Sequence, residues 1–128
     1  MGVLGAGHVL VIGDAPAVVN LLRAELQAEG FKVTGASDGI EGERRALGDD
    51  VTLIVLDRMV PWHDGLDMLM LVRQRRPALP IIVLSARAEV ADRIAALDAG
   101  ATDFLAKPFS PGELVARVHA QLRRAAWA

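Results

Sequence analysis

Four polar residues each follow a short apolar run, and their types suit the chemistry of a phosphoryl group. They are Asp14, Asp57, Ser85 and Lys107. Two carboxylates can hold a hard cation such as Mg²⁺, which prefers oxygen ligands and keeps several waters. A hydroxyl and an ammonium can each contact a phosphoryl oxygen, and a carboxylate can act as the nucleophile that forms an acyl phosphate. If the four side chains meet, the sequence predicts phosphoryl transfer with Asp57 as the acceptor.

Short buried strands are expected to bring these residues together. The run 51–56 before Asp57 is apolar, largely β-branched and without alternation, as in a strand buried on both faces of a parallel sheet. Further strands are expected over 9–12, 31–34, 81–84 and 103–106. Open α/β sheets bind their ligands at the carboxyl ends of the strands. The four polar residues are therefore predicted to meet at one edge of the sheet.

Helical segments are expected between the strands. The first helix starts near Pro16, with Asp14 or Ala15 as its cap, and Gly30 ends it. Its buried stripe is expected at four-residue spacing, at Val18, Leu22 and Leu26. Further helices are expected over 39–47, 66–76, 89–99 and from 111 onward. The second is the weakest, because Gly42 inside it costs about 1 kcal/mol relative to Ala. This alternation of strands and helices predicts an α/β fold with a parallel sheet and helices on both faces.

The composition narrows the choice of function. A chain of 128 residues fits one domain. It carries 14 Lys and Arg against 16 Asp and Glu, a formal charge of −2, so this domain is not expected to bind DNA or anionic membranes. There is no cysteine, and no apolar stretch approaches the roughly 18 residues that span a bilayer. We therefore expect a soluble, cytoplasmic domain.

Together the motifs resemble a response-regulator receiver domain of two-component signalling, over residues 8–124. The matching segments are VLVIGD, LIVLDRMVPWHDG, VLSAR and GATDFLAKPF. The resemblance implies a doubly wound, flavodoxin-like fold with five parallel strands in the order 2-1-3-4-5 and five helices. It also implies that residues 1–128 form one receiver domain, a signalling domain rather than an enzyme, which a histidine kinase phosphorylates.

The resemblance assigns a role to each matching residue. Asp57 is the phospho-acceptor. Magnesium ligands are expected from Asp14, Asp57 and the backbone carbonyl of Met59, the hydroxyl switch is Ser85, the aromatic switch is Phe104, and the phosphate-contacting lysine is Lys107. The Lys107-Pro108 peptide bond is expected to be cis.

Departures from the family pattern thin the acidic pocket. Gly13 stands where the first of two adjacent acids is usual, and Ala15 where a third is common. We therefore expect weak Mg²⁺ binding, and a pseudo-receiver that acts as a phosphorylation-independent interaction or dimerisation module stays as an alternative. An aspartyl-phosphate hydrolase would need a second acid two residues after Asp57, where this chain has Met59. Arg58 is expected to be a surface residue.

The last third of the chain resembles receivers that are attached to winged-helix DNA-binding domains and form two-fold dimers. Interface residues are expected at Arg93, Asp98, Asp103, Glu113 and Arg117. In such a dimer Arg93 would meet Glu113 of the mate, and Asp103 would meet Arg117. Thr102 and His119 replace an acid and a lysine, so one cross-dimer pair is lost. We expect a weak homodimer, with DNA binding only through an output domain absent from this chain.

Overall fold

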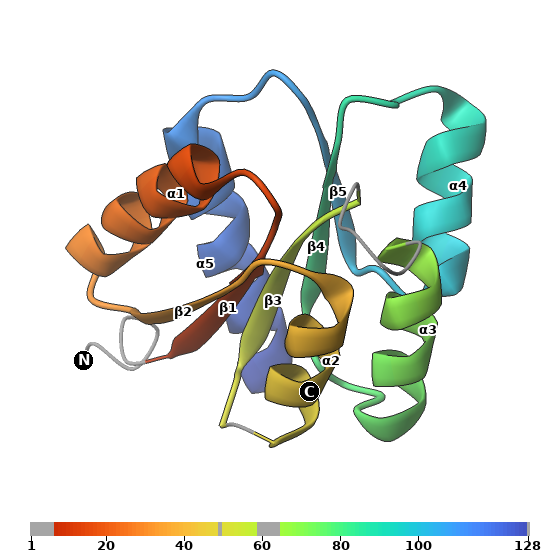
Figure 1. Ribbon diagram of the computed structural model, residues 1–128, viewed down its shortest axis with the longest axis horizontal. Coiled ribbons are helices and arrows are strands. Elements are labelled where there is room, and N and C mark those ends of the chain that lie inside the picture. Colours follow the sequence, from red (N-terminus) through yellow and green to blue (C-terminus); the bar gives the residue numbers. More distant parts are fainter. Residues whose placement is uncertain (1–6, 49, 59–64, 128) are drawn as a thin grey trace.

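Five strands form one parallel sheet in the order β2-β1-β3-β4-β5 (Figure 1). The structure is a computed structural model that describes residues 7–48, 50–58 and 65–127. Its strands are β1 (His8–Ile12), β2 (Lys32–Ala36), β3 (Leu53–Asp57), β4 (Ile81–Ser85) and β5 (Asp103–Ala106). The predicted strand order is therefore confirmed. β1, β3 and β4 are buried along their whole length, which explains their continuous apolar sequences.

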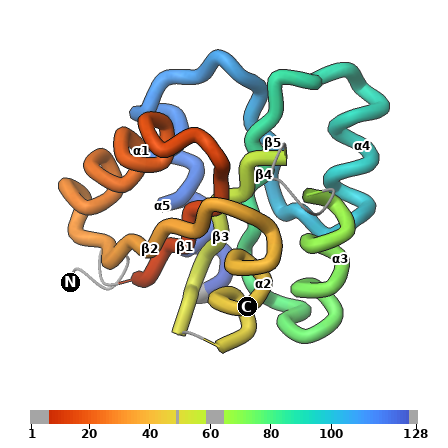
Figure 2. The backbone as a smooth tube through the Cα atoms, viewed as in Figure 1, coloured from red at the N-terminus to blue at the C-terminus, as the bar shows by residue number. Residues whose placement is uncertain are grey.

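Helices alternate with the strands along the chain and cover both faces of the sheet (Figures 1 and 2). They are α1 (Pro16–Ala28), α2 (Gly39–Gly48), α3 (Gly65–Arg75), α4 (Val90–Ala99) and α5 (Pro111–Trp127). One core cluster lies between the sheet and α1 and α5, and the other between the sheet and α2, α3 and α4. Among the described residues, no helix is long and apolar enough to cross a bilayer.

The buried stripe of α1 differs from the prediction at one position. Leu22 and Leu26 are buried as expected, but Val18 is 39% exposed and Val19 takes its place in the core. The structure shows why: Val19 lies over two glycines of the sheet edge. A Cβ built at Gly13 would lie 3.4 Å from Val19, and one at Gly35 would lie 3.2 Å from it. A Cβ at Gly13 would make an ordinary contact with Val19, but one at Gly35 would be tight, so the missing side chain at Gly35 lets α1 approach the sheet through Val19.

Gly42 has a packing role that its intrinsic helix propensity does not reveal. A Cβ on this residue would lie 2.7 Å from the Cδ1 of Ile12 on β1. A larger residue would require the Ile12 side chain or α2 to shift. Glycine has a low helix propensity, but at this position it lets α2 pack closely on the fully buried Ile12.

Candidate functional site

Three of the four predicted site residues lie together at the carboxyl edge of the sheet. Strand β3 pairs with β4 so that Asp57 lies opposite Leu84, and β4 pairs with β5 so that Ser85 lies opposite Ala106. Lys107 follows Ala106 directly, and its amide donates to the carbonyl of Ser85 at 2.9 Å. The parallel register therefore brings residues from positions 57, 85 and 107 to one edge.

An ion pair joins the acceptor candidate to the lysine. The Nζ of Lys107 lies 2.7 Å from Oδ2 of Asp57. Asp57 is 8% exposed, so its carboxylate has lost most of its contact with water. The neighbouring lysine offsets this loss, because a buried charge is costly unless it is paired. The Lys107-Pro108 peptide bond is cis, as expected. The lysine is therefore aimed at the position where a phosphoryl group on Asp57 would carry its charge.

Ser85 lies at the end of β4 and is fully buried. Its Oγ accepts a hydrogen bond of 3.0 Å from the amide of Arg87. A hydroxyl carries one donor hydrogen in addition to its acceptor lone pairs. Ser85 can therefore donate to an oxygen at the same edge of the sheet while it keeps the β4–α4 loop in place.

The acidic pocket is thin. Asp14 is exposed at the end of β1, and Met59 lies outside the described residues. Gly13 is buried, and a Cβ built on it would lie 3.5 Å from the Cβ of Asp57, so an acid at this position would stand beside Asp57. Within the described part of the chain, no group of three or more His, Cys, Asp or Glu is placed to hold a metal. A Mg²⁺ ion held here by Asp57 and the exposed Asp14 would keep most of its waters, because so few carboxylates are present.

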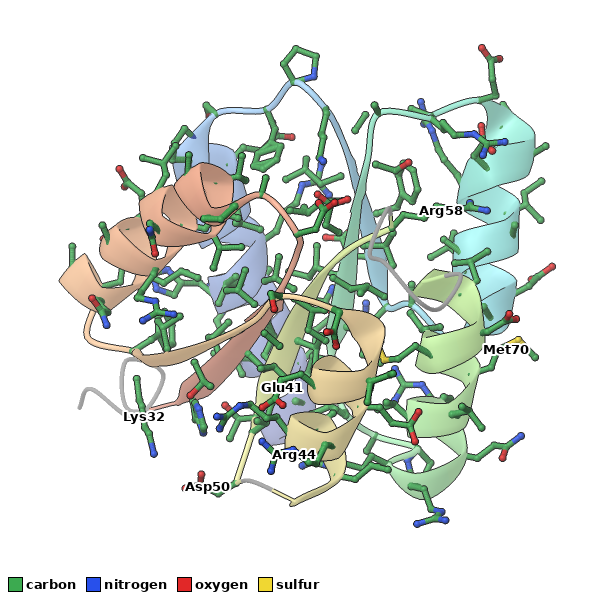
Figure 3. All side chains as sticks on the ribbon, in the orientation of Figure 1. Lys32, Glu41, Arg44, Asp50, Arg58 and Met70 are labelled. Atoms are coloured by element: carbon green, nitrogen blue, oxygen red, sulfur yellow. The ribbon has the colours of Figure 1, made fainter. Side chains whose placement is uncertain are left out.

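Arg58 is not the surface residue that was expected. It is partly buried, and its side chain extends toward α4 (Figure 3). Its Nη1 is buried and meets no hydrogen-bond acceptor among the described residues. The backbone of Arg58 also explains Gly65, the last residue of the LIVLDRMVPWHDG segment: a Cβ there would lie 2.8 Å from the carbonyl oxygen of Arg58. The start of α3 is therefore packed tightly against Arg58, the residue after Asp57.

The expected interface residues lie on α4, β5 and α5, which share one face of the domain. A hollow of about 340 Å³ lies on it, lined in part by Arg93, Phe104 and Arg117. Phe104 is partly buried and packs against the core cluster under α4. Asp98 is exposed on α4. The aromatic residue is thus placed between the core and this hollow.

The charged residues of this face already form pairs within one chain. Nη1 of Arg117 lies 2.9 and 3.1 Å from the two carboxylate oxygens of Asp103, and its Nη2 lies 3.2 Å from Glu113. The hydrogen bond to Asp103, followed by that to Glu113, raises the pKa of the Arg117 guanidinium. Arg93 donates from Nε to the carbonyl of Ala88 at 3.1 Å. Asp103 and Arg117, which were expected to pair across a dimer, therefore pair within one chain. In a dimer, Arg117 would have to share Asp103 with the mate or exchange it for the mate's Asp103.

The two departures on this part of the chain have roles inside the fold. The Oγ1 of Thr102 accepts from the amide of Ile81 at 2.9 Å and donates to the Ile81 carbonyl at 3.0 Å. His119 lies 3.6 Å from the carboxylate of Glu29, and its ring lies 5.6 Å from that of Phe31. Thr102 therefore ties the start of β5 to β4, and His119 links α5 to the end of α1.

Known proteins share both the sequence and the fold. The sequence model of the family described as the response regulator receiver domain matches residues 9–119 of this chain. The chain is 42% identical over 116 residues to the alkaline phosphatase synthesis transcriptional regulatory protein PhoP of Bacillus subtilis, covering 91% of this chain and 48% of PhoP. The chain spans about half the length of the curated relatives it matches.

Solved receiver structures superpose closely on this fold. The receiver domain of the Francisella response regulator 1452 has a TM-score of 0.88 and 32% identity, covering 92% of this chain and 98% of the other. The Thermotoga maritima response regulator TrrA, solved in complex with Mg²⁺ and BeF, has a TM-score of 0.82 and 27% identity, covering 90% and 98%. With the family model matched over most of its length and the site residues gathered at one sheet edge, this chain belongs to the response regulator receiver domains of two-component signalling.

Proposed function

We propose that Asp57 accepts a phosphoryl group from a phosphohistidine of a partner histidine kinase. A carboxylate oxygen of Asp57 attacks phosphorus, a new O–P bond forms, and the N–P bond of the donor breaks, with the electron pair returning to the histidine ring. The observation that carries this proposal is the 2.7 Å contact between Lys107 and Asp57, because it holds a cation where negative charge would accumulate. Ser85, at the same edge, can donate to another phosphoryl oxygen.

Asp14, Asp57 and the backbone carbonyl of Met59 would hold Mg²⁺ in this proposal. When bound, the cation neutralises part of the negative charge of the transferring group. The TrrA complex, which contains Mg²⁺, supports this assignment. Because Gly13 removes one carboxylate from beside Asp57, the affinity for the cation should be low.

The output of the switch is proposed to be the face of α4, β5 and α5. A phosphoryl group on Asp57 would draw the Ser85 hydroxyl toward it, shift Phe104, and change the population of conformations that present this face. Two copies would then associate through Arg93, Asp98, Asp103, Glu113 and Arg117. The relative PhoP is a transcriptional regulatory protein, which supports a transcriptional output through a DNA-binding domain outside these 128 residues. We place the domain in the cytoplasm, where a kinase and DNA would both be reached.

A phosphodonor assay tests the first step. The protein is incubated with acetyl phosphate and Mg²⁺, and its intact mass is measured. The proposal expects one added phosphoryl group in the wild type and none in Asp57→Asn. An unmodified wild type under forcing donor and Mg²⁺, or a modified Asp57→Asn protein, would contradict it.

The second candidate function is a pseudo-receiver that binds its partner without phosphorylation. Gly13 and Ala15 favour it, because with Val18 and Leu84 they line an apolar hollow beside Asp57 where other receivers carry acids. The same mass measurement separates the two functions. A pseudo-receiver would stay unmodified, and its self-association would be unchanged in Asp57→Asn.

A further inference from the structure

Helix α4 is the least embedded helix of the domain. Ala96 is its one buried residue, whereas Val90, Ile94 and Leu97 are 70%, 53% and 48% exposed. The neighbouring helix α3 instead buries Met68, Leu69 and Val72, among others. Tertiary packing supplies most of the stability of a protein helix, so little packing holds α4 on the sheet. What fixes its position must be sought at its ends.

The N-terminal end of α4 is closed by bonds within its own segment. Glu89 and Asp92 form a reciprocal capping box, in which the Glu89 amide donates to Oδ2 of Asp92 at 3.2 Å. Nearby, Nε of Arg93 donates to the carbonyl of Ala88 at 3.1 Å. All of these partners lie at the start of the helix or directly before it. The bonds would therefore travel with this end if it moved.

The C-terminal end is joined to α3 by Arg73. Gly100, whose φ of +125° ends the helix, has its carbonyl held by Nε and Nη2 of Arg73 at 3.0 and 2.6 Å. Nη1 of the same guanidinium donates to the carbonyl of Arg76 at 2.8 Å, just past the end of α3. A Cβ on Gly100 would lie 3.0 to 3.2 Å from three atoms of Arg73. One side chain therefore binds the C-terminal ends of two helices.

Electrostatics favours this contact. The carbonyls at a helix C-terminus carry partial negative charge, so a cation placed there is stabilised. Burial lowers the pKa of the Arg73 guanidinium, yet arginine stays protonated in proteins. On α3, Leu69 lies one turn before Arg73 and is buried in the core, and Val72 beside Arg73 is fully buried. The anchor is thus fixed to the rigid side of the contact.

From these observations we propose that Arg73 anchors the C-terminal end of α4, so that α4 moves by pivoting about the Arg73–Gly100 contact while its N-terminal end swings. Arg73 is then a positioning residue for the face of α4, β5 and α5. The use of the pivot in signalling rests on the proposed function, because phosphorylation of Asp57 would supply the driving change. The anchor itself is a property of the unmodified protein.

Amide hydrogen exchange of the unmodified protein tests the anchor. In Arg73→Met, which keeps an apolar stem and removes all three donors, the amides of residues 97–101 should exchange about tenfold faster, as expected for losing a charge-assisted hydrogen bond. Amides of β1 and β3 should keep their wild-type rates. Arg75→Met, an exposed arginine of the same helix, is the matched control and should leave 97–101 unchanged. Arg73→Lys keeps the charge with a single donor group and should give an intermediate rate, so it replaces the Met variant if that variant does not fold.

Two results would overturn the anchor: wild-type exchange at 97–101 in Arg73→Met and Arg73→Lys, or equal acceleration throughout the domain. Phosphorylation with acetyl phosphate then tests the pivot. In the modified wild type, exchange should change at residues 90–95 and stay constant at 97–101, and in Arg73→Met both parts should change. An even change along α4 of the wild type would refute the pivot. If intact mass shows no phosphoryl group, the proposed function fails, and the exchange of the unmodified variants alone decides the anchor.

Discussion

Lys107 and Asp57 are 50 positions apart in the sequence and form a 2.7 Å ion pair at the carboxyl edge of the sheet. The side chain of Asp57 is 11% exposed and that of Lys107 is 31% exposed, so the contact is mostly shielded from water. We expect the pair to stabilise the unmodified protein, and it places a cation beside Asp57. The same contact therefore serves both stability and the proposed chemistry.

Replacing Lys107 with Met should lower the free energy of unfolding by about 1 to 2 kcal/mol, because the carboxylate of Asp57 loses a charge-assisted hydrogen bond. Urea unfolding with an unchanged m-value measures this difference. Lys107→Arg keeps a cation and should retain more of the stability. An identical midpoint for the wild type and Lys107→Met would show that the pair contributes nothing to folding.

Replacing Gly13 with Asp should tighten Mg²⁺ binding. The new Cβ would lie 3.4 Å from Val19 and 3.5 Å from Asp57, which are ordinary contact distances, so the side chain can be accommodated. An added carboxylate beside the cation should lower its dissociation constant by about tenfold, a modest estimate for unit charges several ångströms apart at an effective dielectric of about 20. Gly13→Asn is the uncharged control. Equal or weaker binding by Gly13→Asp in a Mg²⁺ titration would place the cation elsewhere.

The acyl phosphate on Asp57, once formed, should hydrolyse slowly. Arg87 is exposed two residues beyond Ser85, and Met59 stands two residues beyond Asp57 in the sequence, outside the described residues. A long cation and a bulky apolar chain position an attacking water poorly, so Met59→Asn should speed the decay by about tenfold or more. The decay is followed by intact mass after removal of the donor. A fast decay that Met59→Asn leaves unchanged would remove this explanation.

Self-association should be weak and should fall as salt is added, because charged pairs on the surface are screened. Arg117→Glu should abolish it, since the new carboxylate would face Asp103 and Glu113 in both copies of a two-fold interface. Sedimentation of the phosphorylated protein is the measurement. Arg75→Glu, an equal charge change on exposed α3, is the control, and unfolding curves check that both variants fold. Identical association of the wild type and Arg117→Glu would exclude this face as the dimer contact.

Stability should decline in acid partly through Asp50. The hydrogen bond from Nδ1 of His8, 3.0 Å long, is the largest cause that lowers the pKa of Asp50 below its usual 3.8. Because the folded pKa is depressed, the stabilisation is present above pH 3.8 and is lost as the pH falls through the lower folded pKa. In Asp50→Asn the free energy of unfolding should therefore fall less steeply than in the wild type as the pH drops below about 4. Chemical unfolding at several pH values measures this dependence. His8→Gln should show the same weaker pH dependence. If the free energy of unfolding of both variants fell as steeply in acid as that of the wild type, the role of the His8–Asp50 hydrogen bond would be contradicted.

The strands could be located from sequence because a parallel sheet covered on both faces turns each inner strand into an uninterrupted apolar run. The edge strand β2 was placed too early, at 31–34 instead of Lys32–Ala36, because its half-exposed face weakens that signal. The position of Val19 in the core depends on Gly35 lying under the helix, where a Cβ would be tight against Val19. Helical period fits either valine, because Val18 lies four residues and Val19 three residues before Leu22.

By itself the sequence determined the alternation of strands and helices and the residue types at the strand ends, because propensity and burial act along the chain. The strand ends also led us to expect that Lys107 meets Asp57. Only the tertiary structure decided that Arg117 pairs with Asp103 of its own chain and that Arg73 binds the carbonyl of Gly100. In the sequence Arg73 is one of several arginines near the end of a helix. Its role follows from the packing of α3 beside α4, which brings a carbonyl 27 residues away within hydrogen-bond distance. Contacts of this kind depend on how helices and strands pack against one another, and local sequence patterns do not predict that packing.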